Sequence, residues 1–471
     1  MNWVMFKEYY WAWLWLTLCA LLWWMVPHPL VVIALSIVPL AVLFTLQYPF
    51  FMVLLFVIFS FFRIHEVLPQ LYDFKIPLLL SLASLGSLGW NVFYKKRFTL
   101  WWRPELTSFS YFFIVVSIGV IAASNIPIAK AYYIDIYIKI VLMFFAVTWL
   151  ITNEKDFSIA AKLTVLGGCI VGMKALHNKA NGIGLVEETR VTIGREFGSV
   201  LGDPNDLSLV LMFPTAFAVG FILTKGSHFL TRCYGLVSVG ILFSAVLATQ
   251  SRGGLLGILA VFGVYAYRRI QNKILFVIGG IFAVIILYSV AGISDRASGG
   301  AAEAGIDASA MGRLYAWEAA IGMANDNPLT GVGIDNFYVN YFFYSPHWDG
   351  LNHAVHSTWF GVLAETGYLG FIIFCACIGL VLHTNLKSLS LVCKHEKHFP
   401  TIIKTTAEAL FAGMIGTLAA GTFLTFGFSW PIYILGAMTI SLSQWVDQFY
   451  ASNISPHLSS IMEPKKENHY V

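Results

Sequence analysis

The sequence predicts an all-α polytopic membrane protein with about 12–14 transmembrane helices and a long loop on the outer face. Three observations support this prediction. The chain is 58% hydrophobic and only 11% charged, whereas about 25% of the residues of a soluble domain are charged. Apolar runs of roughly 17–25 residues, the length of helix that crosses a bilayer, recur along the whole chain. The polar stretch 293–356 is the only sizeable interruption of this pattern.

Apolar helices are expected near residues 9–26, 29–46, 48–62, 76–93, 108–123, 133–151, 158–176, 206–224, 231–249, 253–267, 274–292, 357–382, 405–426 and 429–448. The first run is not followed by a small-residue cleavage site, so we expect a retained span rather than a signal peptide.

The orientation follows from lysine and arginine, which favour cytoplasmic loops. Every second loop is basic, including the stretch 386–404, and these loops are expected inside together with both chain ends. The loops 63–75, 177–205, 249–253 and 293–356 then face out. Because the basic residues are dispersed over separate turns, the net charge of +4 does not indicate a nucleic-acid partner.

Five regions are expected. They are N-terminal transmembrane helices (1–175), helices with arginine-bearing outer loops (176–292), the long outer loop with an amphipathic helix (293–356), C-terminal transmembrane helices (357–448) and a cytoplasmic tail (449–471). All six cysteines lie in or beside apolar segments or in the basic loop, which argues against a disulfide framework and against a cysteine-based metal site.

Within the long loop, the segment MGRLYAWEAAIGMAND predicts an amphipathic helix with Leu314, Trp317 and Ile321 on one face. Asn327-Pro328 ends it, and a glycine turn follows. The next twenty residues are rich in aromatic side chains. Such rings suit a membrane interface, and they also suit stacking on sugars.

His356 is the first candidate for chemistry. It precedes an apolar span, and Ser357 is well placed to cap that helix. A histidine that is neutral near pH 7 can accept a proton from a hydroxyl group. The alternative is a polar residue that merely ends a helix. A zinc site made with His347 and His353 is disfavoured, because no cysteine or HExxH-type spacing accompanies them.

Arg252 is the second candidate, because it lies where one apolar span ends and the next begins. Its planar guanidinium suits phosphate oxygens, and a helix start adds partial positive charge. The alternative is an ordinary interfacial arginine.

Arg313 opens the loop helix at the end where the helix dipole disfavours a cation, which indicates an external anion or an ion pair with Glu318 or Asp349. Arg190 and Arg195 could extend the same basic patch.

Three further carboxylates can each be interpreted in two ways, as structural or as functional residues. Asp203 and Asp206 are expected to cap and start a helix at Gly202–Asp206, with acceptor binding as the alternative. Glu365 lies about two turns into a span, where a carboxylate is costly and indicates either function or an interhelical hydrogen bond.

Taken in order, these motifs resemble the O-antigen ligase and O-antigen polymerase family of bacterial envelope proteins, which also holds protein O-oligosaccharyltransferases. The family motif of His, a small polar residue, nine residues, Gly, two residues and Gly is matched by His356-Ser357, Gly367 and Gly370. Further family elements are matched by Asn205 within Gly202–Asp206, by Ser251-Arg252-Gly253, and by Arg313, Trp317, Pro328, Gly331 and Gly333. The resemblance covers roughly residues 190–380.

The resemblance implies a GT-C-like, inverting glycosyltransferase of lipopolysaccharide biosynthesis in the bacterial inner membrane, with its active site facing the periplasm. The implied donor is a glycan on undecaprenyl pyrophosphate, and the acceptor is a hydroxyl group of lipid A-core, of another glycan or of a protein. No metal or cofactor is implied. A polysaccharide polymerase is the nearest alternative. A lipid-linked glycan transporter is less favoured, because the polar groups gather at one face rather than near the midplane.

The implied roles are a general base for His356 and diphosphate clamps for Arg252 and Arg313. Substrate contacts are expected from Arg190, Arg195, Asp203, Asn205, Trp317 and Glu365.

Overall fold

The computed structural model describes residues 3–25, 29–97, 99–290 and 308–454. The Gly/Ala-rich start of the predicted outer loop and the end of the predicted tail lie outside these ranges.

The N-terminal half consists of helices that follow one another with short connections. They are α1 (Trp3–Met25), α2 (Pro29–Gln47), α3 (Pro49–Phe61), α4 (Ile64–Val67), η1 (Pro69–Phe74), α5 (Ile76–Gly89), η2 (Trp90–Tyr94), α6 (Pro104–Ile121), α7 (Ile126–Tyr132), η3 (Tyr133–Tyr137), α8 (Ile138–Leu150) and α9 (Glu154–Ala180).

The second half continues in the same way. It holds η4 (Arg195–Phe197), η5 (Val200–Gly202), α10 (Pro204–Val210), α11 (Met212–Leu223), α12 (Phe229–Thr249), α13 (Arg252–Arg269), α14 (Lys273–Val290), α15 (Ala308–Asp326), α16 (Phe337–Tyr344), α17 (Thr358–Lys394), α18 (Thr401–Gly421), α19 (Trp430–Phe449) and η7 (Tyr450–Ile454).

The all-α class is confirmed: the part of the chain that the structure describes contains no named strand, and every predicted apolar segment lies mainly on a helix. Eight described helices are long and apolar enough to cross a membrane, or up to nine if a bent pair counts as one span. This number is below the predicted 12–14. The predicted spans 29–46 and 48–62 form that bent pair, with an angle of 100°, because Pro49 cannot continue α2. Helix α13, which contains the predicted span 253–267, is not among the eight; its three arginines, at positions 252, 268 and 269, lie at its two ends.

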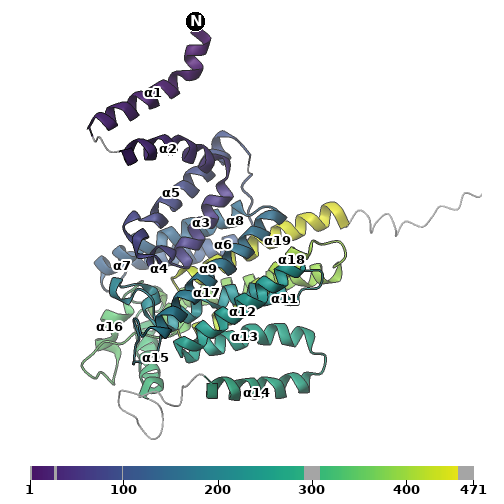
Figure 1. Ribbon diagram of the computed structural model, residues 1–471. Coiled ribbons are helices and arrows are strands. Elements are labelled where there is room, and N and C mark those ends of the chain that lie inside the picture. The colour runs from purple at the N-terminus through teal and green to yellow at the C-terminus, as the bar shows by residue number, and fades with distance from the viewer. Residues whose placement is uncertain (1–2, 26–28, 98, 291–307, 455–471) are drawn as a thin grey trace, which may run out of the picture.

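The core of the bundle is built from helices of the second half together with α6, α8 and α9. Helix α11 packs on α9, α12 and α18, α13 packs on α18, and α17 packs on α6, α15, α18 and α19. In Figure 1, α1 and α2 extend away from this bundle, at the opposite end of the picture from α13 to α15.

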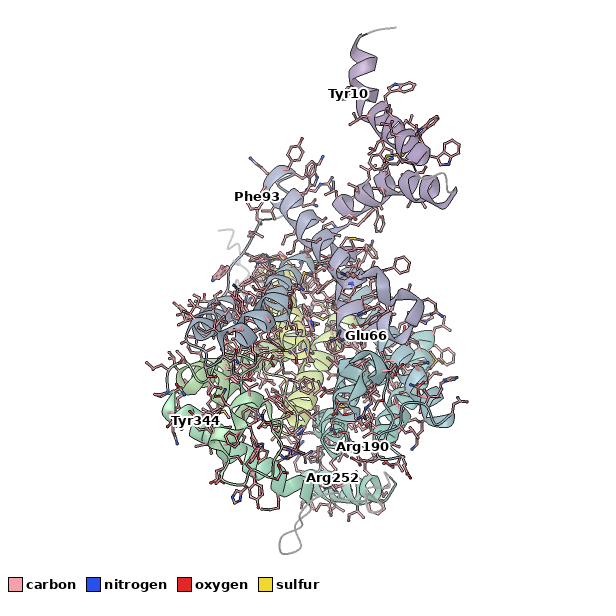
Figure 2. All side chains as sticks on the ribbon, turned by 90° about the vertical axis from the view of Figure 1, so that its left-hand side faces the viewer. Tyr10, Glu66, Phe93, Arg190, Arg252 and Tyr344 are labelled. Carbon is pink, nitrogen blue, oxygen red and sulfur yellow. The ribbon has the colours of Figure 1, made fainter. Side chains whose placement is uncertain are left out.

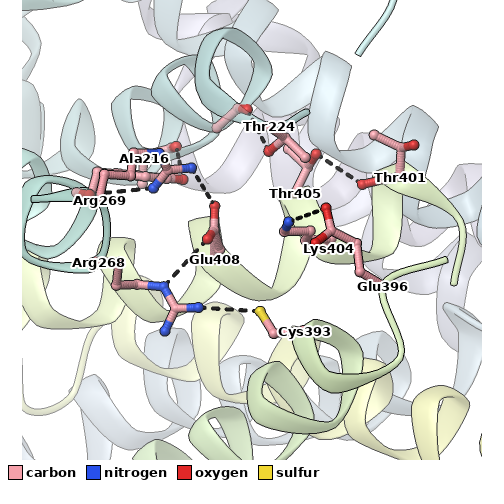
Figure 3. Close-up of polar contacts among 12 residues, drawn as sticks. Ala216, Thr224, Arg268, Arg269, Cys393, Glu396, Thr401, Lys404, Thr405 and Glu408 are labelled. Carbon is pink, nitrogen blue, oxygen red and sulfur yellow. Dashed lines mark hydrogen bonds and ion pairs between the residues drawn. The ribbon is translucent and has the colours of Figure 1, made fainter. Parts of the chain in front are cut away.

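The two ends of α13 carry different charge clusters. Arg252 is its first residue and Arg268 and Arg269 end it, so the clusters lie about 25 Å apart at 1.5 Å per residue. At the second end, Glu408 of α18 accepts hydrogen bonds from Arg268 (3.3 Å) and Arg269 (2.9 Å), as Figure 3 shows. The buried carboxylate therefore joins α13 to α18 at the end away from Arg252.

Helix α17 is broken near its start, at the first glycine of the histidine motif. Gly367 has φ 66° and ψ −173°, a conformation that L side chains rarely adopt. A Cβ atom at this position would lie 2.5 Å from the carbonyl oxygen of Pro328. The break exposes backbone groups that bind the loop after α15: Tyr368 donates to Pro328 (2.8 Å), and Val332 donates to Ala364 (2.9 Å).

Helix α15 packs mainly through small side chains, together with Trp317 from its predicted apolar face. Its buried residues are Ala316, Ala319, Ala320 and Met323, whereas Leu314 is 48% exposed and Ile321 is 40% exposed. Small side chains at helical spacing let two helix backbones approach closely, and α15 uses them against α17. The predicted helix is confirmed, and Trp317 of its predicted apolar face stacks on Phe360 of α17, whereas Leu314 and Ile321 remain exposed.

Candidate active site

A cavity of about 960 Å³ brings together most of the residues that the sequence singled out. It lies between the loop 181–203, the first residues of α10 and α13, the start of α15, and the loop that precedes α17. Its lining includes seven of the predicted site residues: Arg190, Arg195, Asp203, Asn205, Arg252, Arg313 and His356. Figure 2 shows Arg190 and Arg252 near each other in the lower part of the molecule.

Arg252 owes its position to the cap of α13. The Ser251 hydroxyl accepts a hydrogen bond from the amide of Gly254 (3.1 Å) and donates one to Asn205 Oδ1 (2.8 Å). A Cβ atom at Gly254 would lie 2.2 Å from Ser208 Oγ, so α10 and α13 can meet this closely only with glycine here. The guanidinium of Arg252 is thus placed at the positive end of a helix, as predicted.

Arg190 is a buried part of the cavity wall. Its Nε donates to the carbonyl of Thr249 (3.1 Å) and one terminal nitrogen donates to Asn205 Oδ1 (2.9 Å). The other terminal nitrogen lies 3.6 Å from Glu187. Arg190 therefore links the 181–203 loop to the starts of α10 and α13. Arg195, in the short helix η4, is exposed and lines the same cavity.

Asp203 caps α10, as predicted, and also faces the cavity. Its carboxylate accepts the amide of Asn205 at 2.7 Å, and Pro204 occupies the first turn of the helix. One side chain therefore both fixes the helix start and places a negative charge beside the cations.

His356 lies in the left-handed region with φ 45°, which is uncommon for a residue other than glycine. The next residue, Ser357, is the N-cap of α17 and accepts the amide of Phe360 at 3.5 Å, as predicted. Burial lowers the pKa of His356 below its ordinary value of 6.5; Arg313 and His353 lower it further, while Asp203 opposes them. The imidazole is therefore neutral at pH 7 and can act as a base.

Arg313 reaches the cavity from α15, where its guanidinium carbon lies 6.0 Å from the centre of the Phe423 ring. The two carboxylates considered as its partners have contacts with histidines. Asp349 accepts His353 Nε2 at 3.0 Å, which lowers the pKa of Asp349. Glu318 lies 3.8 Å from His347 Nε2.

Trp317 and Glu365 are not among the residues that line the cavity. The Trp317 indole donates to the carbonyl of Val355 (3.2 Å) and stacks on Phe360 with ring centres 4.8 Å apart. Glu365 Oε1 accepts the amide of Phe337 (3.2 Å), at the start of α16. Both side chains support the segments that shape the cavity, and Trp317 binds the residue directly before His356.

Sequence reasoning did not single out Glu187, Ser199 or Tyr341, which also line the cavity. The spacing of Glu187 three residues before Arg190 was a signal for an ion pair. Tyr341 gave no distinguishing signal, because it is one of many aromatic residues in its segment.

The lining as a whole mixes charges: it includes four arginines and the carboxylates of Glu187, Asp203 and Asp349. Two of these carboxylates contact Arg190 and His353. Among the described residues, no group of three or more histidines, cysteines or carboxylates is arranged to hold a metal ion.

Comparisons with known proteins match the part of the chain that carries Arg252, Arg313 and His356. Residues 237–375 match the family model described as O-antigen ligase. The chain is also similar to the exopolysaccharide production protein ExoQ of Rhizobium meliloti (strain 1021), with 29% identity over 227 residues. That alignment covers 41% of this chain and 51% of the relative, so the match spans about half of that protein.

Proposed function

Because this chain belongs to the O-antigen ligase family through residues 237–375, we propose that it transfers an oligosaccharide or polysaccharide from undecaprenyl pyrophosphate to an acceptor hydroxyl group. The chain is a multi-pass membrane protein. The proposed acceptor is lipid A-core, and the proposed location is the periplasmic face of the bacterial inner membrane. The observation that carries the proposal is the presence of His356, Arg252 and Arg313 in one cavity.

The proposed reaction is a direct displacement at the anomeric carbon. The acceptor oxygen forms a bond to this carbon while the bond from the carbon to the pyrophosphate oxygen breaks. The electron pair of the broken bond stays on the pyrophosphate, the proton of the acceptor hydroxyl passes to His356, and the anomeric configuration inverts. A histidine with a lowered pKa is suited to this step, because its neutral form is already present at pH 7.

The arginines would act on the leaving group. Negative charge grows on the pyrophosphate as the sugar departs, and preorganised guanidinium groups stabilise such charge in a site shielded from water. Arg252 has the further advantage of a helix start. Arg190 is held by several protein partners, so its proposed part is to position the wall and add to the positive potential.

The dimensions of the cavity fit this substrate class. About 960 Å³ is near the upper end of the roughly 300–1,000 Å³ of ordinary ligand pockets. A cavity of this size can hold a diphosphate, the sugar attached to it and the acceptor hydroxyl together. The rest of the glycan would extend into solvent.

A second candidate function is supported by the similarity to a protein named for exopolysaccharide production. In this second candidate function, the acceptor is another lipid-linked glycan and the protein acts as a repeat-unit polymerase. The donor chemistry, and therefore the proposed roles of His356 and the arginines, would be the same.

Analysis of lipid-linked glycans in a deletion strain tests the proposal. Finished polymer attached to the lipid carrier should accumulate if the protein is a ligase, and single repeat units should accumulate if it is a polymerase. The wild-type gene should reverse the accumulation, whereas a His356→Ala gene should not. A strain that accumulates neither intermediate would contradict both functions.

A further inference from the structure

A second cavity, of about 450 Å³, lies beside the first. The two cavities share the segment 198–202 as a wall: Ser199 lines the first, and Val200 and Leu201 line the second. The Ser199 hydroxyl donates to the carboxylate of Glu66, which ties this wall to α4. Every residue that lines the second cavity lies outside the family match at 237–375.

Most of the second cavity is apolar. Its walls come from α3, α5, the α7–α8 segment, α10 and the turn before α19, with side chains such as Phe56, Leu78, Ile136 and Trp430. Leu78 is 44% exposed and Ile136 is 38% exposed, so this wall reaches the outside of the bundle. Helix α5 and the α7–α8 segment are candidate membrane spans. The cavity can therefore be entered from the lipid side.

Charged residues also line this cavity. Arg63 and Lys75 stand at the two ends of the short segment between α3 and α5, both in the left-handed region (φ 52° and 47°). Asp135 and Lys139 lie one turn apart inside the candidate span Ile126–Leu150. Ionisable residues within a membrane span are costly and indicate function. Asp135 also belongs to the π-helical turn η3, and such turns are frequent at functional sites.

The charges select an anionic ligand. The lining carries the three cations Arg63, Lys75 and Lys139 against the single carboxylate Asp135, an excess of two positive charges apart from His65. Arg63 also contacts Glu66 (2.8 Å), which leaves the two lysines as the main cationic ligands. A soluble anion would not use the apolar wall. A neutral hydrocarbon would leave charges in a membrane segment without a counterion.

We propose that this second cavity binds an anionic membrane lipid, one whose headgroup carries a phosphate and a net negative charge, with the phosphate at Lys75 and Lys139 and a hydrocarbon chain along Leu78, Ile136 and Trp430. The ammonium groups would donate charge-assisted hydrogen bonds to the phosphate oxygens. Burial of the chain against the apolar wall adds a hydrophobic contribution that inorganic phosphate does not have. The proposal concerns binding alone and does not depend on the transfer reaction.

The test measures lipid binding to the full-length protein in detergent by native mass spectrometry, with phosphatidylglycerol as the probe. Phosphatidylcholine has a headgroup with no net charge. It should bind about tenfold more weakly, because its choline cation offsets the attraction between its phosphate and the lysines. The Lys139→Gln variant should show a similar loss for phosphatidylglycerol. Lys130→Gln is the matched control: Lys130 is exposed on α7 and does not line the cavity.

A second variant tests the apolar part of the site without changing any charge. Ile136→Trp adds volume from a partly exposed position and should reduce the binding of both lipids by filling the apolar part. The melting temperature of each variant without lipid shows that it is folded. Equal binding of the two lipids, equal effects of Lys139→Gln and Lys130→Gln, or protection from thermal unfolding by inorganic phosphate alone would each overturn the proposal.

Discussion

At the scale of single residues, His356 combines two properties that suit a base. Its backbone is held in the left-handed region, which costs about 1–3 kcal/mol in an ordinary residue and persists only where the surroundings enforce it. Burial, Arg313 and His353 lower the pKa of its imidazole, and Asp203 opposes them. Trp317, through its bond to Val355, and Ser357, through the cap of α17, fix the backbone on both sides of the histidine.

The first prediction concerns removal of this base. His356→Ala should lower the rate of glycan transfer at least about a hundredfold, because general-base catalysis contributes about 10²–10⁴. Transfer from purified lipid-linked donor measures the rate, and the melting temperature reports the fold. A variant that is folded and fully active would contradict the role of His356.

The second prediction concerns pH. Only neutral His356 can accept the acceptor proton, and its pKa lies below 6.5 because of burial and the neighbouring cations. The value of kcat/KM should therefore not change with pH near pH 7. It should fall only when the pH drops through this lowered pKa. Asp203→Asn removes the carboxylate that raises the pKa of His356, so the acid limb should move to still lower pH. A shift to higher pH would contradict this electrostatic account.

The third prediction concerns the geometry of the cation. Arg252→Lys keeps the charge but cannot make the planar two-pronged contact with phosphate oxygens, so the transfer rate should fall about tenfold or more. The exposed Arg232 on α12 provides the control, and Arg232→Lys should leave the rate unchanged. Equal rates for wild type and Arg252→Lys would show that Arg252 acts as a simple point charge or has no contact with the donor.

At the scale of elements, the break in α17 explains the spacing of the histidine motif. Nine residues form the short first part of the helix, and Gly367 then turns the backbone so that Pro328 and Val332 can bind it. Gly370 is needed for a different reason, because a Cβ atom there would lie 2.3 Å from the side chain of Thr366. The motif therefore contains both the proposed base and the glycines that fix how the loop after α15 attaches to α17.

The fourth prediction compares two glycines of α17. Gly367→Ala should lower the free energy of unfolding by about 1–3 kcal/mol or more, from left-handed strain and a clash with Pro328, and transfer should fall with it. Gly379→Ala has open space around the added methyl group, and should be neutral or stabilise the helix by up to about 1 kcal/mol. Thermal unfolding in detergent measures both. Equal effects would show that the break does not depend on glycine.

The sequence allowed prediction of those elements whose signals are local. The apolar runs located the helices, and Asp203, Ser251 and Ser357 were recognisable as residues before helix starts, although Ser251 was noted only within its motif. The burial of the alanines of α15 was not predictable from hydrophobicity alone, because two helices that approach closely need small side chains where they meet. The second cavity was not predictable either, because it joins residues near 60, 139, 200 and 430 that only the tertiary structure brings together.

At the scale of the whole molecule, the two charge clusters of α13 define two ends of the bundle. Arg252 belongs to the cavity, and Arg268 and Arg269 belong to the cluster around Glu408. The basic loop 386–404 lies at the second end, since Arg268 contacts Cys393. In the expected orientation this second end faces the cytoplasm, because lysine and arginine accumulate in cytoplasmic loops.

The fifth prediction tests that orientation by thiol labelling. Leu351→Cys, at an exposed position near the cavity, should react with a membrane-impermeant reagent in intact spheroplasts. Lys397→Cys, at an exposed position in the basic loop, should react only after the membrane is permeabilised. The native cysteines are replaced by serine in both variants, and the cysteine-free protein is the control. Labelling of both positions in intact spheroplasts, or the reverse pattern, would contradict the orientation.

Because the loop after α15 is attached to α17, we expect the proposed sugar transfer to depend on the thickness of the surrounding bilayer. The part of α17 that follows the break at Gly367, residues 368–394, has 27 residues, about 40 Å at 1.5 Å per residue, and a span longer than the hydrocarbon layer adjusts to thinner lipids by tilting. Tilting would displace Ala364 and Tyr368, and through their hydrogen bonds to Val332 and Pro328 the loop after α15. Reconstituted protein should therefore show different turnover in short-chain and long-chain phospholipid vesicles.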